Sequence, residues 1–304
     1  MRRDATGAGH RVFRPSHGRP VAYRDLPGPP GAPTVVLLHG IGVTADLNWG
    51  ASLATLRSRF RVIAPDLPGH GRSGGPAPDF RLETCADDIA ELTTALGIDR
   101  FLAVGYSMGS LVAQLLWHRH PDLTDGLVLC ASARNFLGTI AERTISLFSP
   151  AVAIAARFNP LLHVMGAAPL APQLISGLTG QRRTFAVEEM NRTSMATVAA
   201  ALVAVSEFTS HDWIGQIDIP VSVLVPTHDT VVAPARQRRL AEAIPHATVV
   251  TVDGDHAVFA SDPDRFTATL LEVCLAMQAD ISFPCRSAIA RRSPGVPRTA
   301  ADAG

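Results

Sequence analysis

The sequence predicts an α/β fold built on a largely parallel sheet. Short apolar runs rich in β-branched residues alternate with amphipathic stretches over residues 34–131, and the alternation returns over residues 221–278. This pattern is typical of parallel strands joined by right-handed helical crossovers. With 304 residues, of which 47% are apolar, the chain can form one large α/β domain with an insertion, or two small domains.

The individual elements follow from local patterns. A continuous apolar run such as Thr34–Leu38 is typical of a strand buried on both faces of a sheet, and the apolar spacing of residues 82–96, ended by Gly97, is helical. We expect buried strands at residues 34–38, 101–104 and 126–131, and further strands at residues 61–64, 221–225 and 247–252. We expect helices at residues 49–59, 82–96, 110–119, 233–243 and 263–278. Residues 11–14 and 20–24 are expected to form two short antiparallel strands.

The alternation is interrupted between residues 133 and 213. Apolar patches at helical spacing occur there without a convincing strand, at residues 145–158, 161–165 and 195–208. Their Leu, Met and Phe content predicts an apolar helical cap, or lid, inserted between two strands of the core; ordinary surface helices covering the sheet are the alternative. Residues 11–132 and 214–280 then form the two parts of the core, and the tails 1–10 and 284–304 are expected to be disordered.

One turn carries the clearest functional signal. The G-x-S-x-G pattern Gly105–Gly109 joins the apolar run 101–104 directly to an amphipathic stretch. Its two glycines remove the Cβ atoms that would collide where strand and helix meet so closely. Ser107 is thereby expected on a strained turn, with its hydroxyl exposed beside a helix N-terminus. We interpret Ser107 as a catalytic nucleophile; a tight turn with an incidental serine is the alternative.

A serine nucleophile needs a base, and the base needs an orienting acid. Asp229 follows the predicted strand 221–225 and His256 follows the predicted strand 247–252, so both are expected at the sheet edge that carries Ser107. Alternatives remain open at this stage. Asp229 could cap the following helix, His256 could be a surface histidine paired with a nearby aspartate, Asp253 or Asp255, and His228 could compete as the base.

The developing oxyanion needs preorganised N–H donors. One is expected from the backbone of Met108, directly after the serine. The second is expected from the loop after strand 34–38, at Ile41, with Gly42 as the second choice. The candidate substrate contacts lie close in sequence to the predicted triad and oxyanion donors. They are Gly40, Gly42, Tyr106, Val232 and Ala257.

Taken together, these motifs resemble the α/β-hydrolase superfamily over roughly residues 11–280. The resemblance is carried by His39–Gly42, Asp66–Ser73, Gly105–Gly109, Asp229 and His256. It implies an eight-stranded, mostly parallel sheet with a cap inserted after strand six. It also implies Ser107 as nucleophile, Asp229 as acid and His256 as base.

We expect a serine hydrolase of the carboxylesterase or lipase kind, which cleaves an ester or thioester with a hydrophobic acyl group through an acyl-enzyme intermediate. Family members that use a carboxylate nucleophile, such as epoxide hydrolases and haloalkane dehalogenases, are set aside because position 107 is Ser. A C–C bond hydrolase, an acyltransferase or a perhydrolase on the same scaffold are alternatives. A non-catalytic protein that binds or senses a small ligand is an alternative of another class.

Composition indicates which classes of partner and cofactor to expect. The formal net charge is zero and the basic residues form no stripe, so no nucleic-acid partner is expected. The four cysteines, Cys85, Cys130, Cys274 and Cys285, are scattered without metal-ligand or disulfide spacing, and we expect no metal and no cofactor. The N-terminus lacks an apolar signal region, and no apolar run is long enough to span a bilayer. We therefore expect a cytoplasmic protein acting on a small ester-like substrate, with a homodimer as an option.

Overall fold

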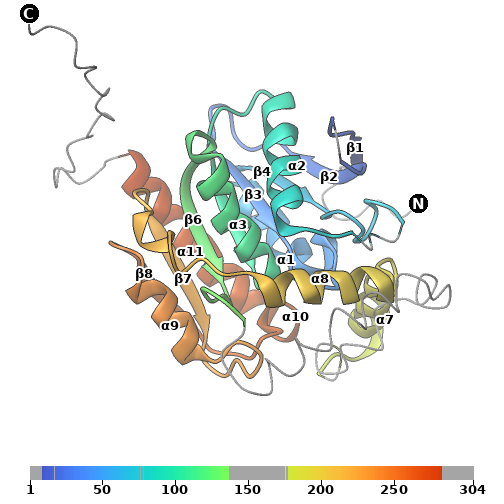
Figure 1. The fold of residues 1–304 in the computed structure, drawn as a ribbon. Helices are drawn as coiled ribbons and strands as arrows, with labels where there is room; N and C mark the ends of the chain where they lie inside the picture. Colours follow the sequence, from blue (N-terminus) through green and yellow to red (C-terminus); the bar gives the residue numbers. More distant parts are fainter. Residues whose placement is uncertain are drawn as a thin grey trace, which may run out of the picture.

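A computed structural model describes residues 9–16, 18–75, 77, 79–136, 175 and 177–282. Eight strands form a single sheet in the order β1-β2-β4-β3-β5-β6-β7-β8, with helices on both of its faces (Figure 1). The strands are β1 (Arg11–Phe13), β2 (Val21–Leu26), β3 (Thr34–Leu38), β4 (Arg61–Pro65), β5 (Phe101–Tyr106), β6 (Thr124–Cys130), β7 (Val221–Pro226) and β8 (Thr248–Val252). The predicted eight-stranded α/β sheet is confirmed.

Strand β2 is antiparallel to both of its neighbours, β1 and β4, and the remaining neighbours pair in parallel. The antiparallel pairing of β1 with β2 confirms the prediction made for the two short N-terminal segments. The parallel strands end at one common edge because every crossover returns the chain to the opposite edge before the next strand begins.

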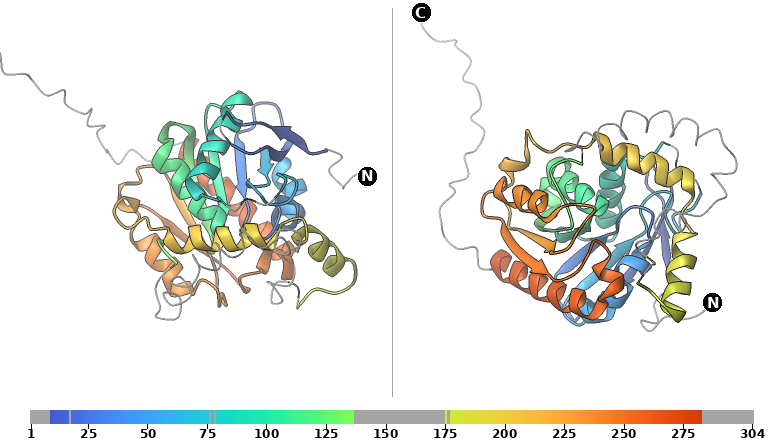
Figure 2. Two further views of the ribbon diagram at one scale, coloured as in Figure 1. Left: turned by 45° about the vertical axis from the view of Figure 1, so that its right-hand side comes forward. Right: turned by 90° about the horizontal axis from the view of Figure 1, so that it is seen from below.

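Helices cover the two faces of the sheet in two layers (Figure 2). They are α1 (Ala45–Arg57), α2 (Leu82–Ala95), α3 (Met108–Arg119), α7 (Gly180–Met190), α8 (Met195–Glu207), α9 (Pro234–Glu242), α10 (Val258–Ser261) and α11 (Pro263–Ser282), with short 3-10 turns at Pro121–Leu123 and Ile214–Gln216. Alternate residues of the central strands point to opposite faces. One apolar cluster therefore joins the strands to α2, α3 and α9, and the other joins them to α1, α10 and α11.

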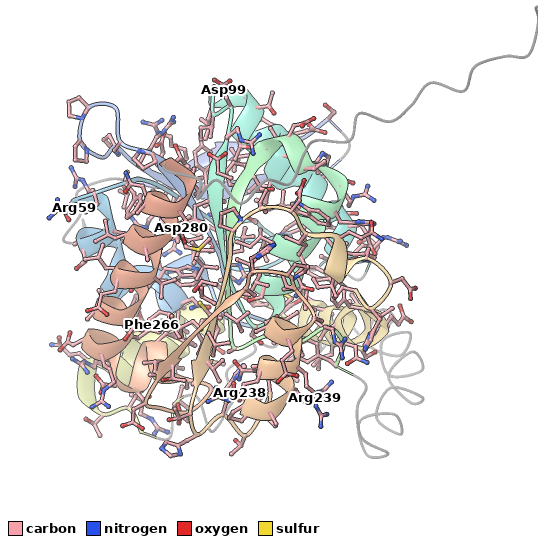
Figure 3. The ribbon with its side chains drawn as sticks, turned by 90° about the vertical axis from the view of Figure 1, so that its left-hand side faces the viewer. Arg59, Asp99, Arg238, Arg239, Phe266 and Asp280 are labelled. Atoms are coloured by element: carbon pink, nitrogen blue, oxygen red, sulfur yellow. The ribbon has the colours of Figure 1, made fainter. Side chains whose placement is uncertain are left out.

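The β8 edge gives a view along the sheet (Figure 3). Helix α11 lies on one side and carries Phe266, whereas α9 carries Arg238 and Arg239. Phe266 is buried and its ring lies 5.7 Å from that of Tyr106 and 6.0 Å from that of Trp49. This aromatic group connects α1 and α11 to the end of β5, directly beneath the serine turn.

Helices α7 and α8 lie between β6 and β7 in the chain, within the segment for which a cap is predicted. Helix α8 contains most of the predicted patch 195–208, whereas the patches at 145–158 and 161–165 lie outside the described residues, as does the tail 284–304. The two ends of the segment run side by side: Ser210 N donates to Arg134 O at 2.9 Å, and Asn135 and Thr209 form an antiparallel bridge.

Backbone segments pack very closely at the turn between β5 and α3. A Cβ added to Gly105 would lie 2.4 Å from the carbonyl oxygen of Gly109, and one added to Gly109 would lie 2.1 Å from the carbonyl oxygen of Leu38. Both distances are far inside van der Waals contact, and the atoms that would have to move belong to the backbone. Glycine is therefore required at both positions by space, whatever the local φ.

We expect Gly109→Ala to destabilise the protein by about 3 kcal/mol, because its methyl group can be accommodated only by separating α3 from the end of β3. Gly50→Ala is the matched control. A Cβ added to Gly50, in α1, would have no atom within 4 Å, so the same change should stabilise by about 1 kcal/mol through helix propensity alone. Urea unfolding of the two variants checks both signs. Equal effects of the two changes would contradict the steric argument.

Candidate active site

Ser107 lies between β5 and α3 in a backbone conformation that is rarely adopted by residues other than glycine. Its φ is 51° and its ψ is −114°, a strained geometry of the kind that costs about 1–3 kcal/mol. The turn is held because Ser107 N donates to Cys130 O of β6 at 2.8 Å. Ser110 Oγ also donates to Gly105 O at 2.7 Å. The serine side chain is thus fixed at the carboxyl edge of the sheet. Ser107 is only 7% exposed, so the residue is buried, whereas the motif predicts an exposed hydroxyl.

The structure brings together the three side chains predicted to form a triad. His256 Nε2 lies 3.2 Å from Ser107 Oγ, and His256 Nδ1 lies 2.8 Å from Asp229 Oδ2. Asp229 follows β7 and His256 follows β8. Because these strands are parallel to β5, their ends lie at the same edge as Ser107, even though 149 positions separate the serine from the histidine in sequence.

The Asp229 carboxylate is buried and accepts hydrogen bonds from two directions. Oδ1 accepts from the backbone amides of Val231 at 2.9 Å and Val232 at 2.8 Å, while Oδ2 accepts from Gln237 Nε2 at 3.0 Å in addition to His256. Helix α9 begins after Ala233, and no side chain caps it. Asp229 is therefore not the cap of this helix, which removes that alternative. Sequence reasoning missed Gln237, because no local pattern links it to the acid.

His256 is supported from below by Tyr106. The phenol donates to the backbone oxygen of His256 at 2.8 Å, and the two rings lie 5.8 Å apart. The pKa of Tyr106 is raised well above its usual value, by burial first and then by the nearby Cys130, Asp229 and Asp255. The hydroxyl therefore remains a proton donor throughout the neutral range.

The other candidate partners of His256 are occupied elsewhere. Asp255 Oδ1 accepts from the backbone amide of Ala257 at 2.9 Å. Asp253 lies 3.1 Å from His228 and 2.6 Å from Arg265 at the surface. His228 is 73% exposed in this surface pair, and its contacts are with Asp253 rather than with Ser107. The geometry thus favours His256 over His228 as the base.

The predicted oxyanion donors lie on the loop after β3 and at the first residue of α3, on either side of Ser107. Among the described residues, the amide of Ile41 makes no backbone hydrogen bond, and Met108, as the first residue of α3, is one of the positions whose amides have no acceptor within the helix. The amide of Gly40 donates to Asn48 Oδ1 at 2.9 Å. It is therefore not available to an oxyanion, which leaves the amide of Ile41 as the candidate donor in this loop. Gly42 has a φ of 71°, a conformation that lets the chain turn back into α1. Asn48 is a second residue that sequence reasoning missed.

His39 anchors the start of this loop. Its Nδ1 lies 2.7 Å from Gly40 O, and its Nε2 accepts from Leu67 N at 2.8 Å. An acceptor at Nε2 and a donor at Nδ1 describe a neutral ring with one defined tautomer. Burial lowers the pKa of His39 to about 4, against the smaller opposing effect of the Gly40 hydrogen bond. His39 therefore serves loop structure.

A buried charged network holds the end of the loop. Thr44 caps α1 and donates to Glu189 Oε2 at 2.7 Å. Arg72 donates to both oxygens of Glu189, at 3.1 and 3.0 Å. Asp66 accepts from the amides of Ala45 and Arg72, at 2.8 Å each. Glu189 belongs to α7, so this network connects the segment between β6 and β7 to the loop of the candidate oxyanion donors.

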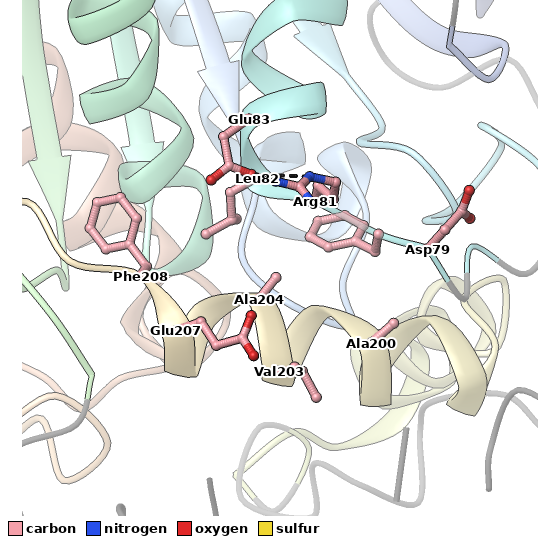
Figure 4. Close-up of a pocket in the computed structure, with 10 residues that line it drawn as sticks. Asp79, Arg81, Leu82, Glu83, Ala200, Val203, Ala204, Glu207 and Phe208 are labelled. Carbon is pink, nitrogen blue, oxygen red and sulfur yellow. Dashed lines mark ion pairs between the residues drawn. The ribbon is translucent and has the colours of Figure 1, made fainter. Parts of the chain in front are cut away.

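The five predicted substrate contacts, including Gly40 and Gly42, are all buried. Val232, Tyr106 and Ala257 are buried, and the first two use their polar groups to support Asp229 and His256. A cleft of about 340 Å³ opens elsewhere, between α8 and the start of α2 (Figure 4). Its lining includes Arg81, Glu83 and Glu207 but none of the predicted substrate contacts and none of the three residues of the predicted triad. The substrate contacts therefore stay predictions.

A metal site would require His, Cys, Asp or Glu side chains that cluster within the described part of the chain. No group of three or more of them there could hold a metal ion. Cys85, Cys130 and Cys274 are free and buried, and Cys285 lies outside the described residues. Of the helices that the structure describes, none has both the length and the apolar character needed to cross a membrane.

Residues 33–263 match the alpha/beta hydrolase fold family. The chain belongs to this family. It is 28% identical over 253 residues to the putative carbamate hydrolase RutD of Agrobacterium fabrum, covering 80% of this chain and 94% of that protein. It is 30% identical over 252 residues to the pimeloyl-(acyl-carrier protein) methyl ester esterase of Chromobacterium violaceum, covering 79% and 93%. The solved enol-lactonase of Burkholderia xenovorans LB400 has a TM-score of 0.70 at 25% identity, covering 88% of this chain and all of that one. Membership makes the protein an enzyme of the α/β-hydrolase superfamily.

The buried neutral His39 predicts a pH dependence of stability. Its folded-state pKa of about 4 lies below the ordinary value of 6.5, so protonation favours the unfolded chain. The stability it contributes is complete above pH 6.5 and is lost as the pH falls toward 4, by about 2 kcal/mol at pH 5. In urea unfolding, His39→Gln should reduce the decrease between pH 7 and pH 5 by this amount. The exposed His211→Gln is the control and should leave the decrease unchanged; an unchanged decrease in His39→Gln would contradict the assignment.

Proposed function

We propose that the protein is a serine hydrolase that cleaves an ester with a hydrophobic acyl group, using Ser107, His256 and Asp229 as its catalytic triad. The observation that carries this proposal is the hydrogen-bonded sequence from Ser107 Oγ to His256 Nε2, at 3.2 Å, and from His256 Nδ1 to Asp229 Oδ2, at 2.8 Å. A serine hydroxyl becomes a good nucleophile only when such a base is adjacent and correctly oriented. Membership in a hydrolase family supports the same chemistry.

In the proposed reaction Ser107 Oγ attacks the ester carbonyl carbon while its proton passes to His256 Nε2. The carbonyl oxygen becomes an oxyanion that accepts hydrogen bonds from the amides of Ile41 and Met108. His256 then donates its proton to the leaving alcohol, and the acyl group stays on Ser107. A water molecule, deprotonated by His256, attacks the acyl-enzyme; the bond to Ser107 Oγ breaks, His256 returns the proton to Oγ, and the acid is released. Asp229 keeps the imidazole in the required tautomer throughout.

We further propose that residues 133–213 form a cap over this edge of the sheet and that residues 11–132 and 214–280 form the core. The packing and the hydrogen bonds of α7 and α8 support the cap. Helix α7 packs against α1 on one face of the sheet, whereas α8 packs against α2 on the other. Both attach to loops that follow the carboxyl ends of strands: Glu189 binds Thr44 after β3, and Thr197 Oγ1 accepts from Ala77 N after β4 at 3.0 Å. Helices α7 and α8 are therefore anchored to loops at the edge where Ser107 lies, which supports the proposed cap.

The names of the relatives support acyl chemistry. A carbamate, a methyl ester and an enol-lactone are the bonds named for the three relatives described above. Each contains a carbonyl carbon bonded to oxygen, which is the electrophile that a serine nucleophile with an oxyanion hole attacks. This similarity favours ester cleavage over C–C bond hydrolysis on the same scaffold. The hydrophobic acyl group is inferred from the apolar sequence of the proposed cap.

The first test is labelling with a fluorophosphonate probe, which reacts only with an activated serine. We expect the wild type to label, and Ser107→Ala and His256→Ala to lose labelling, because the first lacks the nucleophile and the second lacks its base. Ser58→Ala, at the exposed end of α1, is the control and should retain labelling. Persistent labelling of Ser107→Ala would place the reactive serine elsewhere.

The second test is a panel of p-nitrophenyl esters of increasing acyl length, together with a carbamate, a thioester and a vinylogous 1,5-diketone. We expect turnover of the esters with a preference for apolar acyl groups, and a loss of at least about 10⁴-fold in kcat for Ser107→Ala. Turnover of the diketone alone would make the enzyme a C–C hydrolase. Products formed with an added alcohol would indicate acyl transfer. Ligand-induced stabilisation with neither labelling nor turnover would indicate a binding protein.

A further inference from the structure

We propose that Gln237 is a positioning residue for the acid of the triad, holding the Asp229 carboxylate in the rotation that presents Oδ2 to His256. This inference rests on the proposed function, in which Asp229 orients His256. Gln237 lies on α9, the helix that follows the turn carrying Asp229. Its side chain is fully buried, so its contacts are not shared with solvent.

The Gln237 amide bridges two oxygens of the acid turn. Its Nε2 donates to Asp229 Oδ2 at 3.0 Å and to Val232 O at 2.7 Å. Val232 N in turn donates to Asp229 Oδ1 at 2.8 Å. One amide nitrogen thus closes a ring that includes the carboxylate and the backbone of the turn. The carboxylate cannot rotate about its Cβ–Cγ bond without breaking bonds at both oxygens.

The orientation of this amide is determined by its neighbours. If the nitrogen and oxygen of Gln237 were exchanged, the oxygen would face two other oxygens, which is unfavourable. In the observed orientation the second amide atom, Oε1, is buried and has no hydrogen-bond partner among the described residues. A buried acceptor without a partner costs stability. The presence of Gln at this position is therefore explained by what its Nε2 binds rather than by the stability of α9.

The contact matters for the reaction because Oδ2 serves two donors. His256 Nδ1 and Gln237 Nε2 approach the same oxygen, at 2.8 and 3.0 Å. The backbone amides of Val231 and Val232 occupy only Oδ1, so they restrain one end of the carboxylate. Without Gln237, Oδ2 has the imidazole as its sole donor, and its position depends on the group that it has to orient.

The ionisable surroundings allow a test by charge. The groups that face the Asp229 carboxylate or influence it electrostatically are His256, to which it is bonded, and Tyr106, whose raised pKa reflects the charges of Asp229 and Asp255 after burial and Cys130. In Gln237→Glu a protonated carboxyl has the shape of the amide and can donate to Oδ2, whereas the ionised form repels it. Two carboxyl groups that share a site raise the pKa of one of them strongly. We therefore expect the introduced carboxyl to change from protonated to ionised between pH 5.5 and pH 8.5.

The experiment measures the second-order rate of fluorophosphonate labelling at pH 5.5 and pH 8.5, each variant relative to the wild type at the same pH. We expect Gln237→Met to label at least about tenfold more slowly at both values, because Met fills the space without donating. We expect Gln237→Glu to be within about threefold of the wild type at pH 5.5 and at least about tenfold slower at pH 8.5. Gln216→Glu, an identical change at an exposed site, should follow the wild type at both values.

Rescue by the protonated variant distinguishes positioning from packing. Wild-type rates in all variants, or equal losses in Gln237→Met and Gln237→Glu at both pH values, would overturn the proposal. Melting temperatures show whether each variant folds, and if Gln237→Met does not, the pH ratio of Gln237→Glu decides alone. A wild type that does not label would count against the proposed function instead, so the two failures are distinguishable.

Discussion

The close approach of α3 to the end of β3 is the constraint on which the rest of the site depends. Gly109 lies so near the carbonyl of Leu38 that a single methyl group would not fit. The approach brings the first amide of α3 against the loop that leaves β3, so the two candidate oxyanion donors come from adjacent pieces of backbone. It also forces Ser107 into its strained conformation. Strain, nucleophile position and donor position are thus consequences of one backbone contact.

Buried polar groups then keep this backbone in place. His39 is held neutral between Gly40 and Leu67, and Glu189 is 2% exposed yet bound by Arg72, Thr44 and Arg192. A buried charge is tolerated only when its hydrogen bonds are satisfied. Because Glu189 lies on α7 and Thr44 follows the oxyanion loop, the same network that neutralises the charge connects the proposed cap to the loop.

The sequence predicted most of the fold and the residues that meet at its edge because the relevant signals are local. Apolar runs mark the strands, and Ser107, Asp229 and His256 each follow a strand whose direction the alternation predicts. The supporting residues carry no such signal. Asn48 binds Gly40 across a turn, Gln237 acts from the opposite end of a loop, and Glu189 contacts Thr44 across 145 positions of sequence. Their roles depend on tertiary packing, which periodicity and short motifs do not describe.

Helix α9 contacts both the Asp229 carboxylate and the start of the segment between β6 and β7. Gln237 points inward to the carboxylate of Asp229, while the adjacent Arg236 donates to Asn135 O at 2.6 Å, where the segment between β6 and β7 begins. The other end of that segment is tied to the same strip of backbone through Ser210 and Arg134. One short helix therefore contacts both the acid of the proposed triad and the base of the proposed cap. Arg236 and Gln237 are adjacent on α9, so the contact with the start of that segment and the contact with the Asp229 carboxylate both depend on the position of the same helix.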